Sequence, residues 1–228
     1  MKIIKLILRK IKRLANKIFG TKTDEFYWKF RHMFDKGWAE NYISEKSIDN
    51  PHRKFLIEKI LNYFPFENVL EIGCASGPNL YILAKKFPGV KFYGIDISKK
   101  AIKTGRDFFK KENMENVFLE IGEAEKLNKF SDKSIDIIFT DAVLIYLGMD
   151  KINLAIKEML RVAKKAIILH EQHNELSPSI YQDRWIHNYK NLFGKFIPKE
   201  KIRIDKISKK LSKEGWGELD YIIEVKLL

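Results

Sequence analysis

Apolar residues follow two alternating patterns along most of the chain. Short, nearly continuous apolar runs are separated by longer segments in which apolar residues return every three or four positions. The first pattern is typical of buried strands and the second of helices packed on them. The pattern predicts strands at residues 68–72, 91–95, 116–121, 135–140 and 166–169, and helices at 52–64, 78–87, 98–112 and 150–163. Strands that alternate with helices imply βαβ units and a largely parallel sheet.

The pattern changes after the strand expected at 166–169. A further helix is expected over 178–193, and strand candidates follow at 202–207 and 220–227 with no long helix between them. Consecutive strands without a crossover helix favour an antiparallel pair at a sheet edge. We therefore expect an α/β fold of the Rossmann-like, doubly wound type, with a mostly parallel seven-stranded sheet and an antiparallel edge strand.

An N-terminal helical extension is predicted before this domain. Residues 1–19 carry apolar side chains at helical spacing on one face and cations on the other. The apolar stripe consists of Ile3, Ile4, Ile7, Leu8, Ile11, Leu14, Ala15 and Ile18. Residues 24–50 are rich in aromatic side chains and are expected to form helices and a loop. The chain is thus divided into an extension, residues 1–50, and a main domain, residues 51–228.

Charge bears directly on this extension. The chain has 43 Lys and Arg against 30 Asp and Glu, a formal net charge of +13, and basic residues crowd before Asp24. A basic excess favours anionic partners, either nucleic acid or a lipid surface. Residues 1–19 could lie on an anionic membrane, or their apolar stripe could pack on the domain or on another subunit. The single cysteine, Cys74, excludes an internal disulfide. We therefore expect a cytoplasmic protein, peripheral on the inner face of the membrane in the first alternative.

A glycine-containing turn follows the strand at 68–72. Glu71, Gly73 and Gly77 mark a strand that runs into a tight turn and then a helix, where a nucleotide-like ligand sits in open α/β sheets. The dinucleotide fingerprint G-x-G-x-x-G would need glycine at positions 75 and 78, which are Ala75 and Pro78. That mismatch disfavours an NAD enzyme. A phosphate-binding P-loop is disfavoured too, because no Gly-Lys-Ser/Thr follows the turn.

Further candidate residues follow the next strands. Asp96 ends the strand at 91–95, where its two oxygens can accept hydrogen bonds from both hydroxyls of a ribose. Glu123 and Ala124 follow the third strand, and Asp141 follows the fourth. Because the carboxyl ends of parallel strands meet at one sheet edge, we expect these side chains to lie close together.

These segments, in this order, resemble the class I methyltransferases that depend on S-adenosylmethionine (SAM), with the type 11 and type 25 methyltransferase domains as the nearest subgroup. The resemblance covers about residues 50–170. It implies SAM as the cofactor, with these binding residues: Glu71, Gly73, Cys74, Ala75, Gly77, Asp96, Ile97, Glu123, Ala124 and Asp141. Two departures are Ala75 in place of the middle glycine of the family's first motif and Glu123 in place of its usual aspartate.

The same resemblance implies the type of reaction, a methyl transfer from SAM. Methyl transfer from a sulfonium is an in-line displacement, and a base is needed only when the acceptor must lose a proton. His170, Glu171 and His173 follow the strand at 166–169 and are the candidate bases, with the two histidines favoured for a role that faces the substrate. The alternative is a turn that merely caps the strand. We expect no metal, since His173 lies three rather than four residues after His170 and the H-E-x-x-H motif is absent.

Aromatic residues of the extension have two alternative roles. Tyr27, Trp28 and Arg31 could form a lid over SAM with Arg31 pairing its carboxylate, or the aromatics could be part of the core. Trp185 and His187 could cover an acceptor pocket or form one packed helix face.

The acceptor is not identified by the sequence. A small molecule or a saccharide- or lipid-linked substrate is the first hypothesis. RNA, bound through the basic surface, is the second, although the Asn/Asp-Pro-Pro-Tyr segment of amino-methylating nucleic-acid enzymes is absent. A non-catalytic protein with this fold is the third.

Overall fold

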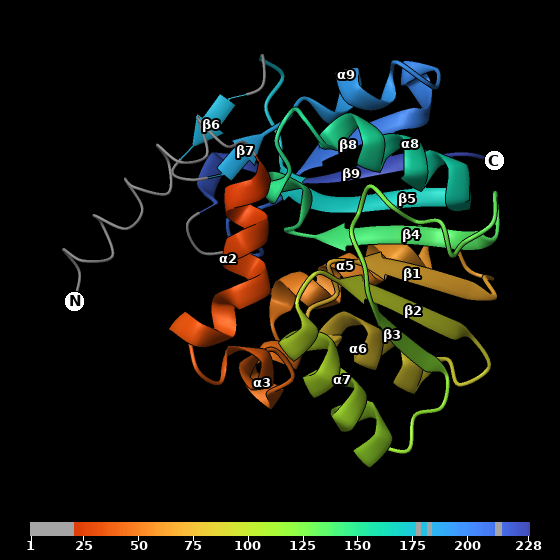
Figure 1. The fold of residues 1–228 in the computed structure, drawn as a ribbon. Coiled ribbons are helices and arrows are strands. Elements are labelled where there is room, and N and C mark those ends of the chain that lie inside the picture. The colour runs from red at the N-terminus through yellow and green to blue at the C-terminus, as the bar shows by residue number, and fades with distance from the viewer. Residues whose placement is uncertain (1–20, 177–178, 182–183, 213–215) are drawn as a thin grey trace.

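The computed structural model describes residues 21–176, 179–181, 184–212 and 216–228, which form a central sheet with helices on both faces (Figure 1). The strand order is β3-β2-β1-β4-β5-β9-β8. The strands are β1 (Asn68–Ile72), β2 (Lys91–Asp96), β3 (Val117–Ile121), β4 (Ile135–Asp141), β5 (Ala163–Gln172), β8 (Ile202–Lys206) and β9 (Asp220–Lys226). Strands β1 to β5 are parallel, and β9 is antiparallel to both β5 and β8. The predicted fold class, with its antiparallel pair at the edge, is confirmed.

Each face of the sheet carries its own apolar core. On one face lie α5 (Pro51–Leu61), α6 (Pro78–Lys86) and α7 (Lys99–Lys111), and on the other α8 (Ile152–Val162) and α9 (Tyr189–Phe193). Short 3₁₀ turns lie at Leu144–Tyr146, Lys199–Lys201 and Gly217–Leu219. Strand β4 is buried over its first six residues because both of its faces are covered, which explains its continuous apolar sequence.

Local sequence fixes the start of the helices that matter for the site. Pro78 occupies the first turn of α6, directly after Gly77, which has a φ of 86°. A Cβ on Gly77 would lie 2.7 Å from a ring carbon of Phe109, so glycine lets α6 and α7 approach. Ser98 caps α7 by accepting a hydrogen bond from the Ala101 amide at 3.3 Å.

The extension forms helices, as predicted. They are α2 (Thr21–Phe34), α3 (Trp38–Tyr42) and α4 (Glu45–Ile48). Helix α2 stands beside the arrowheads of β4 and β5, across the carboxyl edge of the sheet (Figure 1). The helix predicted over residues 1–19 lies outside the described residues. Within the described residues, no helix is long and apolar enough to span a bilayer.

The helix predicted over 178–193 is wrong. That segment contains a small hairpin of β6 (Ser179–Tyr181) and β7 (Arg184–Ile186), and helix α9 begins only at Tyr189. The physical reason is tertiary pairing: His187 bridges to His173, and the Asn174 amide donates to the His187 carbonyl at 3.2 Å. These bonds hold the backbone extended where local periodicity alone suggested a helix.

Candidate functional site

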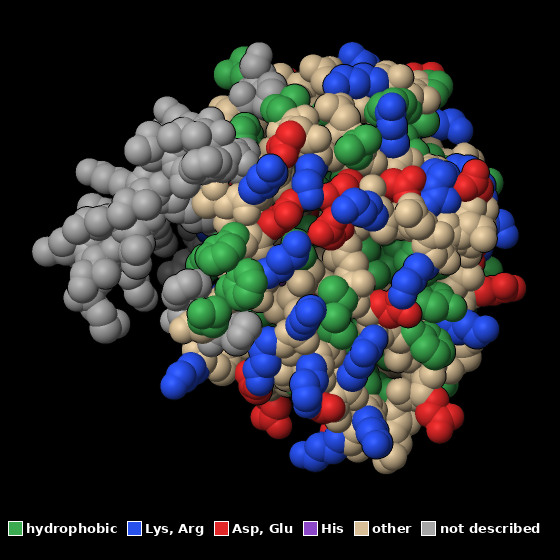
Figure 2. Space-filling view, viewed as in Figure 1, with side chains coloured by type: hydrophobic (Ala, Val, Ile, Leu, Met, Phe, Trp, Pro, Cys, Tyr) green, Lys and Arg blue, Asp and Glu red, His purple; other side chains and the backbone are tan. Residues whose placement is uncertain are grey.

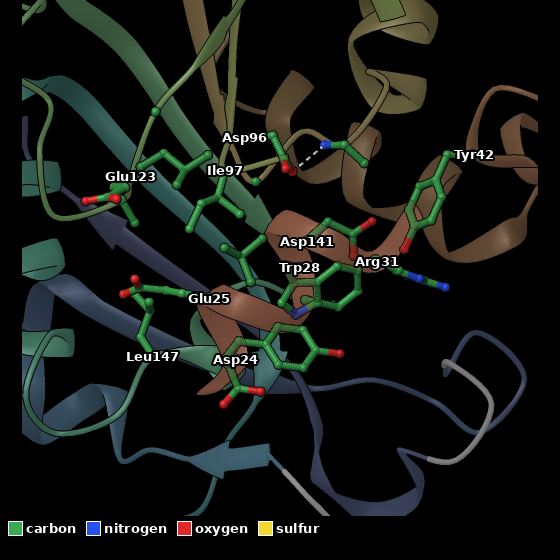
Figure 3. A pocket seen from close by; sticks show the side chains of 18 of the residues that line it. Asp24, Glu25, Trp28, Arg31, Tyr42, Asp96, Ile97, Glu123, Asp141 and Leu147 are labelled. Atoms are coloured by element: carbon green, nitrogen blue, oxygen red, sulfur yellow. Dashed lines mark hydrogen bonds between the residues drawn. The ribbon is translucent and has the colours of Figure 1, made fainter. Parts of the chain in front are cut away.

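A cavity of about 490 Å³ lies at the carboxyl ends of β1, β2 and β4 and is covered by α2 and α3 (Figure 3). The strand order reverses between β1 and β4, which is the position where open α/β sheets bind ligands. The volume lies within the roughly 300–1,000 Å³ range of small-molecule sites. The sheet supplies the floor of this cavity and the N-terminal extension supplies its cover.

The turn after β1 forms one wall of the cavity. Gly73 has a φ of 71°, and a Cβ there would lie 2.2 Å from Cγ2 of Val143. The amides of Gly73 and Cys74 both donate to the Ile95 carbonyl, at 2.7 and 3.0 Å. The turn is therefore held against the end of β2, and glycine is required both for its conformation and for the approach of Val143.

Asp96 is fixed at the end of β2 by backbone amides. Its Oδ2 accepts from the Ala75 amide at 2.9 Å and its Oδ1 from the Ser98 amide at 2.8 Å. Burial raises the pKa of Asp96, and the two amide hydrogen bonds partly offset this rise. Each oxygen retains a lone pair, so the oriented carboxylate can accept further hydrogen bonds from a ligand in the cavity.

The structure brings most of the predicted binding residues together. The cavity is lined by Gly73, Ala75, Asp96, Ile97, Glu123, Ala124 and Asp141. Glu71, Cys74 and Gly77 do not line it. Glu71 is buried behind the turn, where it accepts from Asn79 Nδ2 at 2.7 Å, and burial raises its pKa well above the usual range. These three residues shape the turn from behind rather than face the cavity.

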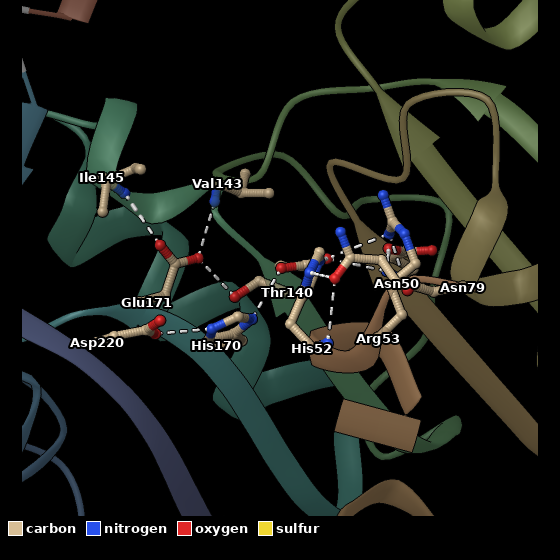
Figure 4. A network of polar contacts seen from close by, with 12 residues as sticks. Asn50, His52, Arg53, Asn79, Thr140, Val143, Ile145, His170, Glu171 and Asp220 are labelled. Atoms are coloured by element: carbon tan, nitrogen blue, oxygen red, sulfur yellow. Dashed lines mark hydrogen bonds and ion pairs between the residues drawn. The ribbon is translucent and has the colours of Figure 1, made fainter. Parts of the chain in front are cut away.

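Asp141 is the centre of a polar network, of which Figure 4 labels His52, Arg53, His170 and Asp220. Its Oδ2 lies 3.3 Å from Arg53 Nη1 and 3.5 Å from His52 Nε2, while its Oδ1 lies 3.0 Å from His170 Nδ1. The other ring nitrogen of His170 lies 2.7 Å from Oδ1 of Asp220. Helix α5 and strand β5, which are distant in sequence, thus fix one carboxylate at the cavity wall.

The histidines proposed as bases lie elsewhere than expected. Strand β5 does not end at Leu169 but continues to Gln172, because β9 pairs with it along this length. His170 and His173 are consequently 1% and 3% exposed, and neither lines the cavity. Burial lowers the pKa of His173. Their catalytic role stays a prediction that this placement does not favour.

Glu171 holds the loop that follows β4. Its Oε1 accepts from the Thr140 hydroxyl at 2.7 Å and from the amides of Val143 and Leu144 at 2.9 and 3.0 Å. Its Oε2 accepts from the Ile145 amide at 3.3 Å. Since Val143 lines the cavity, this buried carboxylate shapes the cavity wall without facing it.

Helix α2 lines the cavity with one stripe of side chains at helical spacing. The stripe consists of Thr21, Asp24, Glu25, Trp28 and Arg31, and Asp35, directly after the helix, also lines the cavity. Arg31 lies 4.8 Å from the ring centroids of both Trp28 and Trp38, and its buried Nε has no partner among the described residues. The expectation that Trp28 and Arg31 cover the cavity agrees with this placement, whereas Tyr27 does not line it.

His52 and Arg53 are cavity residues that the sequence did not reveal as such. Both lie in the first turn of α5, after the Asn50 cap, and Asn50 Oδ1 lies 2.7 Å from His52 Nδ1. A signal was present, because Arg53 shares helical spacing with Leu56 and Ile60, and a cation on an apolar stripe indicates a buried partner.

Metal ligands are not gathered in the described part of the chain. No group of three or more His, Cys, Asp or Glu side chains there could hold a metal ion.

Comparisons with known proteins agree on one kind of domain. The sequence model of a family described as "Methyltransferase domain" matches residues 65–224. A tRNA (guanine-N(7)-)-methyltransferase of Oceanobacillus iheyensis is 29% identical over 111 residues, which are 46% of this chain and 51% of that protein. The chain thus spans about half the length of this curated relative.

Solved structures share the fold. A SAM-dependent methyltransferase from Aquifex aeolicus superposes with a TM-score of 0.59 at 19% identity, covering 86% of this chain and 100% of that one. The geranyl diphosphate C-methyltransferase of Streptomyces coelicolor, in complex with Mg²⁺, geranyl diphosphate and S-adenosyl-L-homocysteine, gives 0.63 at 12% identity, covering 85% and 84%.

Proposed function

The chain belongs to the methyltransferase-domain family, of the SAM-dependent class I type, and on that premise we propose that it binds SAM in this cavity and transfers the methyl group to a small-molecule or saccharide- or lipid-linked acceptor. The observation that carries the proposal is the Asp96 carboxylate, oriented by the amides of Ala75 and Ser98 beside the Gly73 turn. A carboxylate in this position suits the two hydroxyls of a ribose.

The remaining cavity residues fit the other parts of SAM. We assign the adenine end of SAM to Glu123 and Ala124. We assign the carboxylate of its methionine part to Arg31, because the N–H at Arg31 Nε has no hydrogen-bond acceptor among the described residues. Acidic side chains outnumber the two arginines, Arg31 and Arg53, along the cavity wall. Excess negative charge stabilises a sulfonium cation.

The chemistry places few demands on the protein beyond alignment. SAM supplies an activated methyl group, and the chain's work is to hold the acceptor in line with it and to exclude water. Where the acceptor must lose a proton, His52 is the histidine placed to take it, since it lines the cavity next to Asp141.

The covered cavity favours a compact acceptor. Helix α2 closes the carboxyl edge of the sheet, and its inner stripe is fixed to the domain. Thr21 Oγ accepts from the Gly148 amide at 2.7 Å and donates to Asp150 Oδ1 at 2.6 Å. A small molecule or one end of an amphiphile can enter such a site without displacing the cover.

RNA is the second candidate acceptor. The partial match to a tRNA methyltransferase and the net charge of +13 support it. A base held within a folded RNA would need α2 to move away from the cavity. Methyl transfer from labelled SAM to bulk tRNA, absent with extracts of small molecules and lipids, would establish this alternative over the first.

Calorimetry with SAM and S-adenosylhomocysteine tests cofactor binding. We expect micromolar affinity for both and a loss of about 10- to 150-fold in Asp96→Ala, because a charged hydrogen-bond acceptor contributes roughly 1.5–3 kcal/mol. Asp107→Ala is the matched control, since Asp107 is exposed on α7 and pairs with Lys103, away from the cavity. Equal affinity of Asp96→Ala and the wild type would contradict the assignment.

A further inference from the structure

Helix α2 has two faces with different roles. Asp24, Trp28 and Arg31 point into the cavity, at spacings of four and three residues. Phe26, Phe30 and Met33 have the same spacings but lie on the other side of the helix. The cover of the cavity therefore presents a second stripe of side chains outward.

This outer stripe is apolar and exposed. Phe26, Phe30 and Met33 are 59%, 38% and 64% exposed. The rings of Phe26 and Phe30 contact each other, with centroids 4.8 Å apart. Figure 2 shows a green cluster on this side of the molecule, over α2. Contiguous exposed aromatic surface, as opposed to single scattered apolar residues, marks an interaction site.

Charge indicates what this surface contacts. Lys22 and Lys36, before and after the stripe, are exposed, whereas Lys29 between them pairs with Glu25 and Glu123. The preceding residues of the chain add Lys2, Lys5, Arg9, Lys10, Lys12, Arg13 and Lys17, with no acid before Asp24. Residues 1–20 lead directly into Thr21, the first residue of α2. An apolar stripe with aromatic side chains, bordered by cations, fits the headgroup region of an anionic bilayer.

We propose that the outer face of α2, formed by Phe26, Phe30 and Met33, docks on an anionic lipid bilayer and so places the covered cavity at the membrane surface. The apolar side chains enter the acyl boundary, and the lysines lie among the headgroups. Docking itself is independent of the proposed function. Its bearing on the acceptor rests on that function: a cavity whose cover lies on the bilayer suits an acceptor that has a lipid tail.

Vesicle co-sedimentation of the full chain tests the docking surface. We compare vesicles of phosphatidylcholine alone with vesicles that also contain phosphatidylglycerol. The wild type should bind the anionic vesicles, less at high salt. The variant Phe26→Ser/Phe30→Ser/Met33→Ser should bind at least about tenfold more weakly, because its apolar burial is lost. The matched control carries serine at Leu154, Phe196 and Leu228, which are 51%, 41% and 81% exposed outside α2, and should bind like the wild type.

A second measurement reports on the helix face directly. An environment-sensitive fluorophore attached at Met33→Cys should shift to the blue when anionic vesicles are added, while the same label at the exposed Glu115→Cys should not. Cys74 is 1% exposed and does not compete for labelling. This readout holds even if the serine variant folds poorly.

Several results would overturn the proposal. Vesicle binding that is unchanged in the α2 variant would assign any membrane contact to residues 1–19 alone. Absence of vesicle binding, together with a dimer or an RNA complex that the α2 variant abolishes, would make this face a protein or nucleic-acid contact. Affinity for S-adenosylhomocysteine, measured in the same variants and expected to be unchanged, separates failure of docking from failure of the proposed function.

Discussion

Replacing Glu171 by alanine would remove the carboxylate that holds the loop after β4. Four donors would lose their acceptor: the Thr140 hydroxyl and the amides of Val143, Leu144 and Ile145. Glu171 is fully buried, so water does not replace it without local opening. The loss therefore combines broken charge-assisted hydrogen bonds with unsatisfied backbone donors.

The magnitude follows from these contacts. Leaving a buried donor without its acceptor costs about 1–3 kcal/mol, and because the costs of neighbouring donors are not fully additive, we expect a total of about 3–5 kcal/mol for the four donors. For a domain of this size, each kcal/mol shifts the melting temperature by about 2–4 °C. Glu171→Ala should therefore melt roughly 6–20 °C below the wild type. Glu171→Gln retains an acceptor for the three shorter bonds, and its loss should be about 1 kcal/mol, mainly at Ile145.

Thermal unfolding followed by circular dichroism checks the stability, and calorimetry with S-adenosylhomocysteine checks the cavity wall. The affinity should fall in Glu171→Ala because Val143 and Leu147 line the cavity. Glu115→Ala, at an exposed glutamate, is the control. A melting temperature for Glu171→Ala within 2 °C of the control, or equal loss in the alanine and glutamine variants, would refute the role given to this carboxylate.

Substitutions at Gly73, His187 and Arg31 test the turn after β1, a buried histidine and the cover of the cavity. Gly73→Ala should lose cofactor affinity and about 1–3 kcal/mol of stability, because Gly73 has a φ of 71° and a Cβ at this position would meet Val143. The control Gly89→Ala, at a position with open space around it, should leave the melting temperature nearly unchanged. Burial lowers the pKa of His187 from 6.5 to about 4. The neutral, buried imidazole therefore stabilises the fold fully above about pH 6.5, and this stabilisation is lost as the pH falls toward 4. His187→Gln should therefore flatten the decline of the melting temperature between pH 6.5 and 4. Arg31→Lys should weaken binding of S-adenosylhomocysteine severalfold by calorimetry, because an ammonium cannot replace the planar guanidinium between two tryptophans.

Much of the sheet could be predicted because its signals are local. The strand at 68–72 was predicted with the bounds of β1, and Asp96 and Asp141 fall at strand ends as the apolar runs indicated. Parallel topology then dictates that these ends meet at one edge, so seven of the ten predicted binding residues line the cavity.

The predictions that were wrong or incomplete concern features that depend on contacts between distant segments. The end of β5 is set by pairing with β9, which leaves no mark near His170 in the sequence. The extended backbone before α9 is held by a parallel bridge between His173 and His187, against a helical periodicity. The burial of Arg53 beside Asp141 joins residues that are 88 positions apart. Such pairings require the whole topology, and local patterns do not encode them.

Two segments of the chain contribute side chains to the cavity, and this division has an evolutionary consequence. The family match begins at residue 65, yet about half of the lining side chains come from earlier residues, mainly on α2, α3, α4 and the start of α5. The region that the family model matches supplies the floor and the turn beside Asp96, while the preceding segment supplies the cover. Diversification of the first segment alone could thus change substrate preference while leaving the cofactor half intact. A chimera that exchanges only this segment between relatives is the natural route to transplanting specificity.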